Sequence, residues 1–212
     1  MRSRLFLQVF ISLIVTALVA WPASAKLINP STQTIVVFGD SLSAGYGIQQ
    51  NQSWVSLLQA RLKQQKLPYQ VINASISGET TSGGLARFSE MLTTHKPSIV
   101  ILELGANDGL RGLPVSEMRA NLNAMIVQAK TAKAKLLLVG MKIPPNYGQK
   151  YSRDFSASYT SLAKQHKIKL VPFLLEGVAG KPSLILDDGL HPIAAAQPAL
   201  LENVWGALKK ML

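Results

Sequence analysis

Five short apolar runs, separated by longer segments with a helical pattern, constrain the fold of this chain more than any other feature. Runs of this length that are rich in Val, Ile and Leu and bounded by glycine or polar residues are typical of buried strands. The runs lie at residues 34–38, 69–73, 98–104, 135–141 and 169–172. Five buried strands are therefore the expected framework of the fold.

The segments between these runs carry apolar residues three and four positions apart, which is the spacing of one helix face. Strands that alternate with helices predict βαβ units, a parallel sheet and helices on both of its faces. The sequence thus predicts a three-layer αβα sandwich with five parallel strands in the flavodoxin-like order. The helices are expected around residues 54–62 and 85–92 and over 115–132, 153–166 and 194–212.

Glycine and polar residues gather in the segments that follow the strands. In a parallel sheet these segments meet at the carboxyl edge, where open α/β sheets bind their ligands. Residues spread over most of the chain are therefore expected at one edge of the sheet. The segments are 39–41, 73–78, 105–109, 142–148 and the stretch around Asp188 and His191.

The N-terminus has the pattern of a secretory signal peptide. Two arginines, Arg2 and Arg4, precede an uncharged apolar run over residues 5–20, and Ala23-Ser24-Ala25 follows as a small-x-small cleavage site. Cleavage between Ala25 and Lys26 would leave residues 26–212 as one exported domain, periplasmic or secreted. An uncleaved membrane anchor is the alternative, although the run is short for a span of about 20 residues.

Composition limits the partners and cofactors of this chain. The absence of cysteine excludes disulfides and thiolate metal sites, and we expect neither a metal nor a cofactor. The formal charge is +11, and removal of the two leader arginines would leave +9. Such a surface could make transient contact with anionic lipid, but the charges are scattered and form no nucleic-acid motif. We expect a monomer with small-molecule substrates.

Ser41 and His191 are the candidate nucleophile and base. Ser41 follows the first apolar run directly, so it stands at the carboxyl edge, and a serine needs a base to take its proton. His95 and His166 lie in expected helix ends, where a partial positive charge suits the helix dipole. His191 is the remaining histidine and has acids just upstream in Asp187-Asp188-Gly-Leu-His191.

The carboxylate that orients His191 is either Asp188 or Asp187, and the spacing of three favours Asp188. Donors for a tetrahedral oxyanion are the Ser41 amide, the Gly78 amide and the Asn107 side chain. Gly78 could equally be a turn glycine, and Asn107 alone could be an Asx-turn residue.

Other polar residues near these loops have structural interpretations. Asp40 could cap the helix that follows it and steady the loops around Ser41. Glu103 ends an apolar strand as a buried acid that could pair with a loop amide or a basic residue. Turn hydroxyls are the expected role of the nearby serines, Ser43, Ser75 and Ser77.

Gly39-Asp40-Ser41-Leu42, Gly78, Gly105-x-Asn107-Asp108 and Asp188-x-x-His191 follow one another in the order of the four sequence blocks of the SGNH, or GDSL, hydrolases, which this sequence resembles. Longer segments, 39–46, 71–78, 103–105, 107–112 and 145–148, resemble in particular their multifunctional periplasmic thioesterase, protease and lysophospholipase (arylesterase) group. The likeness covers nearly all of the chain after the leader.

The resemblance implies a flavodoxin-like sandwich that hydrolyses acyl esters, thioesters and lysophospholipids without a metal or cofactor. It implies Ser41 as nucleophile, His191 as base and then acid, Asp188 as its partner, and an oxyanion hole of Ser41, Gly78 and Asn107. Departures such as Gly47 bear on loop mobility and chain-length preference. The loop expected to shape the acyl site is Ile143, Pro144, Pro145, Asn146 and Tyr147.

Two other functions fit the same residues. The first is a carbohydrate esterase on the same scaffold that removes acetyl groups from glycans. The second is a binding module that kept the loops and lost turnover, although the intact serine, asparagine and histidine speak against it.

Overall fold

A five-stranded parallel sheet forms the centre of the protein. The computed structural model describes residues 32–212, so the expected signal peptide and its cleavage site lie outside the described residues. The strand order is β2-β1-β3-β4-β5 and every neighbouring pair is parallel, which confirms the predicted fold. The strands are β1 (Gln33–Gly39), β2 (Tyr69–Asn73), β3 (Ile99–Glu103), β4 (Lys135–Val139) and β5 (Lys169–Val171).

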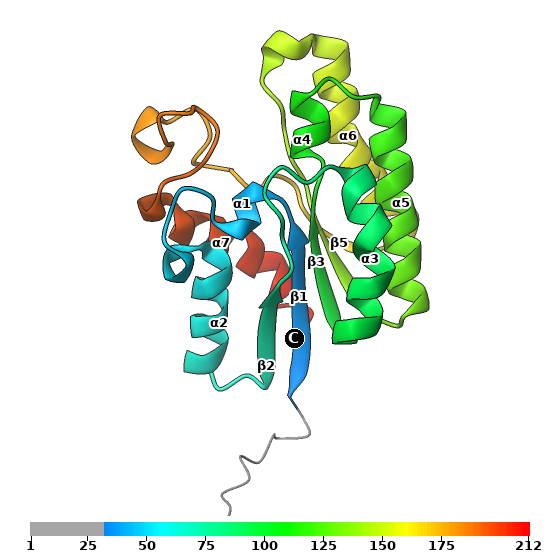
Figure 1. Ribbon diagram of the computed structural model, residues 1–212, viewed down its shortest axis with the longest axis vertical. Helices are drawn as coiled ribbons and strands as arrows, with labels where there is room; N and C mark the ends of the chain where they lie inside the picture. The colour runs from blue at the N-terminus through cyan, green and yellow to red at the C-terminus, as the bar shows by residue number, and fades with distance from the viewer. Residues whose placement is uncertain (1–31) are drawn as a thin grey trace, which may run out of the picture. The chain divides into compact units, whose positions relative to one another are not determined.

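Helices cover both faces of the sheet (Figure 1). On one face α2 (Trp54–Gln64) packs against α7 (Gln197–Leu208), and on the other α5 (Val115–Thr131) packs between α3 (Thr81–His95) and α6 (Gln149–His166). The chain changes direction between β1 and β3, because β2 lies on one side of β1 and β3 on the other. This switch point places the loops after β1 and β3 around one crevice.

Six short helices complete the described part of the chain and mostly follow the strands at the carboxyl edge. They are α1 (Ser41–Ala44), α4 (Ala106–Leu110), and the 3-10 helices η1 (Gln50–Gln52), η2 (Pro145–Tyr147), η3 (Pro182–Leu184) and η4 (Ala194–Ala196).

Two helix boundaries differ from the prediction. Helix α6 begins at Gln149, four residues before the predicted start, because its first turn is polar and carries little apolar spacing. Helix α7 spans only Gln197–Leu208 of the predicted 194–212, since Pro198 occupies its first turn and the residues before it form η4.

The core lies on both faces of β1, β3 and β4. Ile35, Val36 and Val37 of β1 are fully buried, as are Val100 and Ile101 of β3. A strand buried on both faces reads as a continuous apolar run rather than an alternating one, which is why these strands were visible in the sequence. Within residues 32–212, no helix has the length and hydropathy needed to cross a bilayer.

Candidate active site

Ser41 is the first residue of α1, directly after β1. The side chain of Asp40 accepts a hydrogen bond from the Leu42 amide at 3.1 Å and so caps this helix, as predicted. An N-cap carboxylate satisfies one of the amides that the first helical turn leaves unpaired. The cap holds Ser41 at the rim of the sheet, at the switch point.

A buried carboxyl group lies underneath this turn. Glu103 of β3 stands opposite Gly39 of β1 in the sheet register. Its Oε2 accepts a hydrogen bond from Ser43 Oγ at 2.6 Å and a longer one, at 3.5 Å, from the Asp40 amide. A Cβ at Gly39 would lie 2.6 Å from Glu103 Oε2, so only glycine leaves room for this carboxyl. Of the predicted partners for Glu103, the loop amide is therefore the one observed, joined by a serine hydroxyl.

Burial raises the pKa of both acids. The pKa of Asp40 is raised to about 7, mainly by desolvation and further by the charge of Asp108. Burial and then the neighbouring charge of Asp40 raise the pKa of Glu103 well above its usual value. Because Ser43 and a backbone amide donate to it, Glu103 is a structural anchor of the Ser41 turn rather than a group exposed to substrate.

His191 is carried by a small hairpin far along the chain. Ile185 and Pro192 form an antiparallel bridge, and the amide of Leu186 donates to the His191 carbonyl at 2.7 Å. Below the hairpin, Gln197 of α7 accepts a hydrogen bond from the Trp54 amide and thereby ties α7 to α2. The hairpin places the imidazole over the start of α1.

The imidazole of His191 lies between Ser41 and Asp188. Its Nε2 is 2.7 Å from Ser41 Oγ, and its Nδ1 is 2.7 Å from Asp188 Oδ2. The other oxygen of Asp188 accepts the amides of Leu190 at 2.8 Å and of His191 at 3.0 Å. Asp187 is exposed, so of the two candidate acids it is Asp188 that contacts the ring.

These hydrogen bonds also keep Asp188 ionised. They lower its pKa to about 2, with the His191 amide as the largest cause and the Leu190 amide next. A carboxylate that accepts several hydrogen bonds is stabilised in its charged form. Asp188 is thus charged at neutral pH, which suits it to hold the Nδ1–H tautomer of the imidazole.

Asn107, in α4 after β3, lines the same cavity as Ser41. Its Nδ2 donates to the Glu79 carbonyl at 3.0 Å and makes a longer contact of 3.4 Å with Asp40 Oδ2. These contacts run to other loops, so Asn107 does not form the Asx turn that was its alternative interpretation. Gly78 lines the same cavity, and Arg111 donates to its carbonyl.

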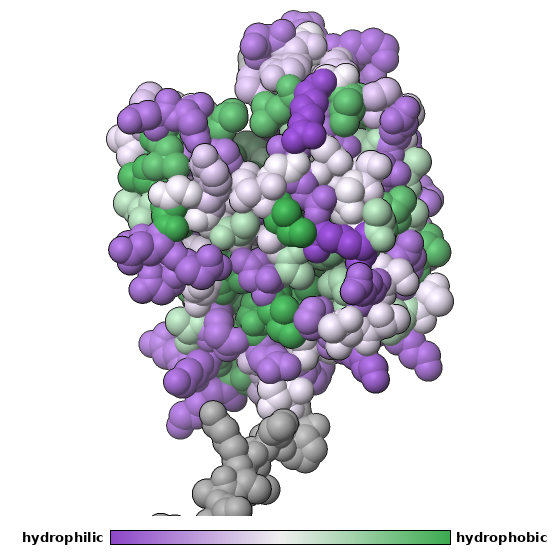
Figure 2. All heavy atoms as spheres, viewed as in Figure 1, coloured by the Kyte–Doolittle hydropathy of each residue, from purple (hydrophilic) through white to green (hydrophobic). Residues whose placement is uncertain are grey.

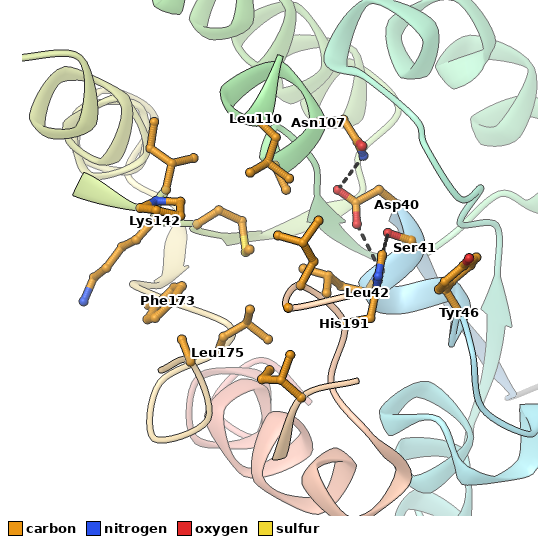
Figure 3. A pocket seen from close by; sticks show the side chains of 18 of the residues that line it. Asp40, Ser41, Leu42, Tyr46, Asn107, Leu110, Lys142, Phe173, Leu175 and His191 are labelled. Atoms are coloured by element: carbon orange, nitrogen blue, oxygen red, sulfur yellow. Dashed lines mark hydrogen bonds between the residues drawn. The ribbon is translucent and has the colours of Figure 1, made fainter. Parts of the chain in front are cut away.

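A cavity of about 600 Å³ opens beside Ser41. Its size is typical of a small-molecule site, and Figure 2 shows the molecule hollowed at this end. Figure 3 shows Ser41, His191 and Asn107 at one side and apolar side chains across from them. The apolar lining includes Leu42, Leu110, Met141, Ile143, Phe173, Leu175, Ile185 and Leu190.

The predicted acyl loop contributes to this cavity only in part. Ile143 and Pro144 line it, whereas Asn146 and Tyr147, in η2, are not among its lining residues. Tyr147 instead donates its hydroxyl to the Leu110 carbonyl at 2.9 Å, and so supports a residue that does line the cavity.

Sequence reasoning missed most of the apolar wall. Phe173, Leu175 and Ile185 lie in the connection after β5, which has no periodic pattern. Tyr46 was missed as well, and its ring centroid lies 4.5 Å from that of His191. The only signal for Tyr46 was its place between two glycines, directly after the Ser41 turn.

The two other histidines lie at the expected helix ends, but Ser43 is not the expected turn hydroxyl, because it is buried in α1 and donates to Glu103. His95 ends α3 and His166 ends α6, where its Nε2 lies 2.7 Å from Asn123 Oδ1. Ser77 lines the cavity. Within residues 32–212, no group of three His, Asp or Glu side chains is arranged to hold a metal ion.

The fold and the Ser41–His191–Asp188 arrangement define a hydrolase of the serine type. The chain belongs to the GDSL-like lipase/acylhydrolase family, whose model matches residues 37–198. It is accordingly an ester hydrolase of that family.

Named relatives cover most of the chain. Esterase TesA of Pseudomonas aeruginosa is 50% identical over 182 residues, which are 86% of this chain and 90% of the relative. An arylesterase of Vibrio mimicus is 45% identical over 184 residues, which are 87% of this chain and 92% of the relative. Thioesterase 1/protease 1/lysophospholipase L1 of Escherichia coli K12 is 41% identical over 81% of each chain.

The fold agrees with a solved structure. The crystal structure of TesA superposes with a TM-score of 0.83 at 50% identity. The match covers 85% of this chain and 100% of the TesA chain.

Proposed function

We propose that this protein is an exported serine esterase that hydrolyses acyl esters and thioesters through a Ser41–His191–Asp188 triad and an acyl-enzyme. The observation that carries the proposal is the imidazole of His191, 2.7 Å from Ser41 Oγ, beside an apolar cavity. The names of the relatives, which include esterase, arylesterase and thioesterase, support ester and thioester bonds as the ones that this protein hydrolyses.

In the first half of the reaction, Ser41 Oγ attacks the acyl carbonyl while its proton passes to His191 Nε2. Asp188, ionised by its hydrogen bonds, stabilises the imidazolium that results. The oxyanion is bound by the amides of Ser41 and Gly78 and by Asn107 Nδ2, whose long contact with Asp40 can be exchanged for it. His191 then gives its proton to the leaving alcohol or thiol.

In the second half, His191 takes a proton from water, which attacks the Ser41 ester. The tetrahedral intermediate collapses, the proton returns to Ser41 Oγ, and the carboxylic acid leaves. Each proton moves between His191 Nε2 and an oxygen or sulfur atom beside it, so the cycle needs no metal or redox group.

The apolar cavity favours acyl chains longer than acetyl. Each methylene that leaves water contributes about 0.8 kcal/mol, or about fourfold in kcat/KM. A series of 4-nitrophenyl esters from acetate to decanoate should therefore show kcat/KM rising until the cavity is full. Ser41→Ala should abolish turnover of every ester, whereas normal turnover in this variant would refute the nucleophile.

The second candidate is a carbohydrate acetylesterase. The mostly apolar lining of the cavity offers few hydrogen-bonding groups for the hydroxyl groups of a glycan. A kcat/KM that is highest for acetyl esters, together with release of acetate from acetylated xylan, would favour this alternative over the long-chain esterase.

Export, the monomeric state and transient contact with anionic lipid belong to the same proposal. N-terminal sequencing of protein recovered outside the cytoplasm should begin at Lys26. A start at Met1 in a membrane fraction would instead support the uncleaved anchor. Light scattering should give the mass of one chain.

A further inference from the structure

Tyr46 packs on the imidazole that the proposed mechanism uses. The ring centroids of Tyr46 and His191 are 4.5 Å apart, and the ring planes are inclined by 41°. Tyr46 also lines the cavity, yet 53% of its surface is exposed, more than for any other large hydrophobic residue within 32–212. One part of the ring is therefore in contact with His191 while a large part stays open to a ligand.

The Ser41–His191 pair separates Tyr46 from most of the apolar lining of the cavity. Figure 3 shows Tyr46 on one side of the Ser41–His191 pair and Leu110, Phe173 and Leu175 on the other. An acyl carbonyl at Ser41 Oγ sends its acyl chain and its leaving group in different directions. The apolar side suits the acyl chain, so the leaving group must extend past Tyr46.

Proton transfer from His191 also requires that the leaving group lie on the side of Tyr46. His191 Nε2 has to reach the leaving oxygen or sulfur, so the leaving group lies at the edge of the imidazole. The Tyr46 ring lies against this imidazole, so the first carbons of the leaving group come within reach of the tyrosine. Aromatic pairs gain stability beyond their buried area when their rings are offset or edge-to-face.

Two glycines and the His191 hairpin hold Tyr46 in place. Gly45 and Gly47 both have left-handed backbones, with φ of 78° and 75°, and the Tyr46 amide donates to the Ser41 carbonyl at 3.1 Å. A Cβ at Gly47 would lie 2.5 Å from Leu186 Cδ1, so the absent side chain lets the hairpin dock there. Tyr46 is thereby fixed relative to Ser41 and to His191.

We propose that Tyr46 is a specificity-determining residue that binds the leaving group and favours aryl esters and aryl thioesters over alkyl ones. This inference rests on the proposed function, because it assumes that acylation takes place at Ser41. It concerns only the acylation step, since the leaving group is gone before water attacks.

The test compares two leaving groups on one acyl chain. Phenyl octanoate and ethyl octanoate are hydrolysed by the wild-type enzyme, by Tyr46→Ala and by Tyr46→Phe, and kcat/KM is measured for each. The ratio of variant to wild type removes the difference in chemical reactivity between the two esters. Val127→Ala, on α5, serves as a control for the loss of an exposed apolar side chain.

Tyr46→Ala should lower kcat/KM for the phenyl ester by about three- to tenfold, the size of one aromatic pair, and change the ethyl ester less than twofold. Tyr46→Phe and Val127→Ala should leave both esters nearly unchanged. An equal loss on both esters would overturn the proposal, because Tyr46 would then act on His191 itself. An unchanged phenyl to ethyl ratio would overturn it as well.

The proposed function has a separate check in the same assay. If Ser41→Ala keeps its activity, the assignment of the triad is wrong, whatever the effect of the Tyr46 variants. If Ser41→Ala is inactive and the ratio does not respond to Tyr46→Ala, only the leaving-group proposal fails.

Discussion

The two halves of the candidate site are held in different ways. Ser41 sits above the buried acids Asp40 and Glu103. The hydrogen bonds in this half connect residues that are far apart in the sequence, with separations of 60, 63 and 67 positions. His191 sits on a surface hairpin, and the bonds of Asp188 to it and to Leu190 span two or three positions. The side chain of Asp188 is 36% exposed, whereas Asp40 and Glu103 have no exposed surface.

This difference separates stability from catalysis. A change in the buried half disturbs the packing of β1 against β3 and should lower the free energy of unfolding. A change in the hairpin disturbs a few local bonds near solvent, so it should affect turnover and leave folding almost unaltered. The following substitutions test this distinction.

Asp188→Asn should give the largest effect, a loss of about 10⁴ in kcat, because an amide favours the wrong tautomer of the imidazole. The free energy of unfolding should change by less than about 1 kcal/mol, as for other exposed pairs. Esterase kinetics and urea unfolding measure the two quantities. Asp187→Asn is the matched control and should keep full activity. If Asp187→Asn is the inactive variant, the assignment of the acid is wrong.

Asn107→Ala should lower kcat by about 10²–10³ with little change in KM, the usual cost of one oxyanion donor. Because this side chain also donates to Glu79, the free energy of unfolding should fall by about 1 kcal/mol. This variant would thus show both effects, because Asn107 is bonded within the buried half and also lines the cavity. A rise in KM at constant kcat would show that Asn107 binds substrate without stabilising the oxyanion.

Glu103→Gln should change how stability depends on pH. The folded state raises the pKa of Glu103 from 4.5, so above pH 4.5 the folded protein holds a proton that the unfolded chain has lost. The contribution of Glu103 to the free energy of unfolding therefore falls as pH rises, by at most about 1.4 kcal/mol per pH unit for one proton, and Asp40, whose pKa is also raised, adds a slope of the same sign.

Urea unfolding between pH 4 and 8 measures this slope. Glu103→Gln should be less steep than wild type, because glutamine does not titrate. Glu90→Gln, at an exposed position on α3, should keep the wild-type slope. Parallel slopes for wild type and Glu103→Gln would show that Glu103 is ionised in the folded protein.

Much of the framework was predictable because its signals are local. The continuous apolar runs of β1 and β3 reflect burial on both faces, and the glycine-rich ends of the strands mark the edge where ligands bind. The start of α6 was not predictable, because its first turn has polar residues that carry no periodic pattern.

The apolar wall was not predictable for a different reason. Phe173, Leu175 and Ile185 lie in an irregular connection, and nothing in their neighbours indicates which cavity they face. Leu190 adjoins His191 in sequence and could have been suspected on that ground.

The sequence alone determined which residues can carry the chemistry: a serine after a buried strand, and a histidine with acids three and four positions before it. Only the tertiary structure decided that His191 meets Ser41 across 150 positions, that Asp188 rather than Asp187 holds the ring, and that Tyr46 covers it. Local patterns report secondary structure and burial, whereas contacts between distant segments depend on how the sheet and hairpin pack together.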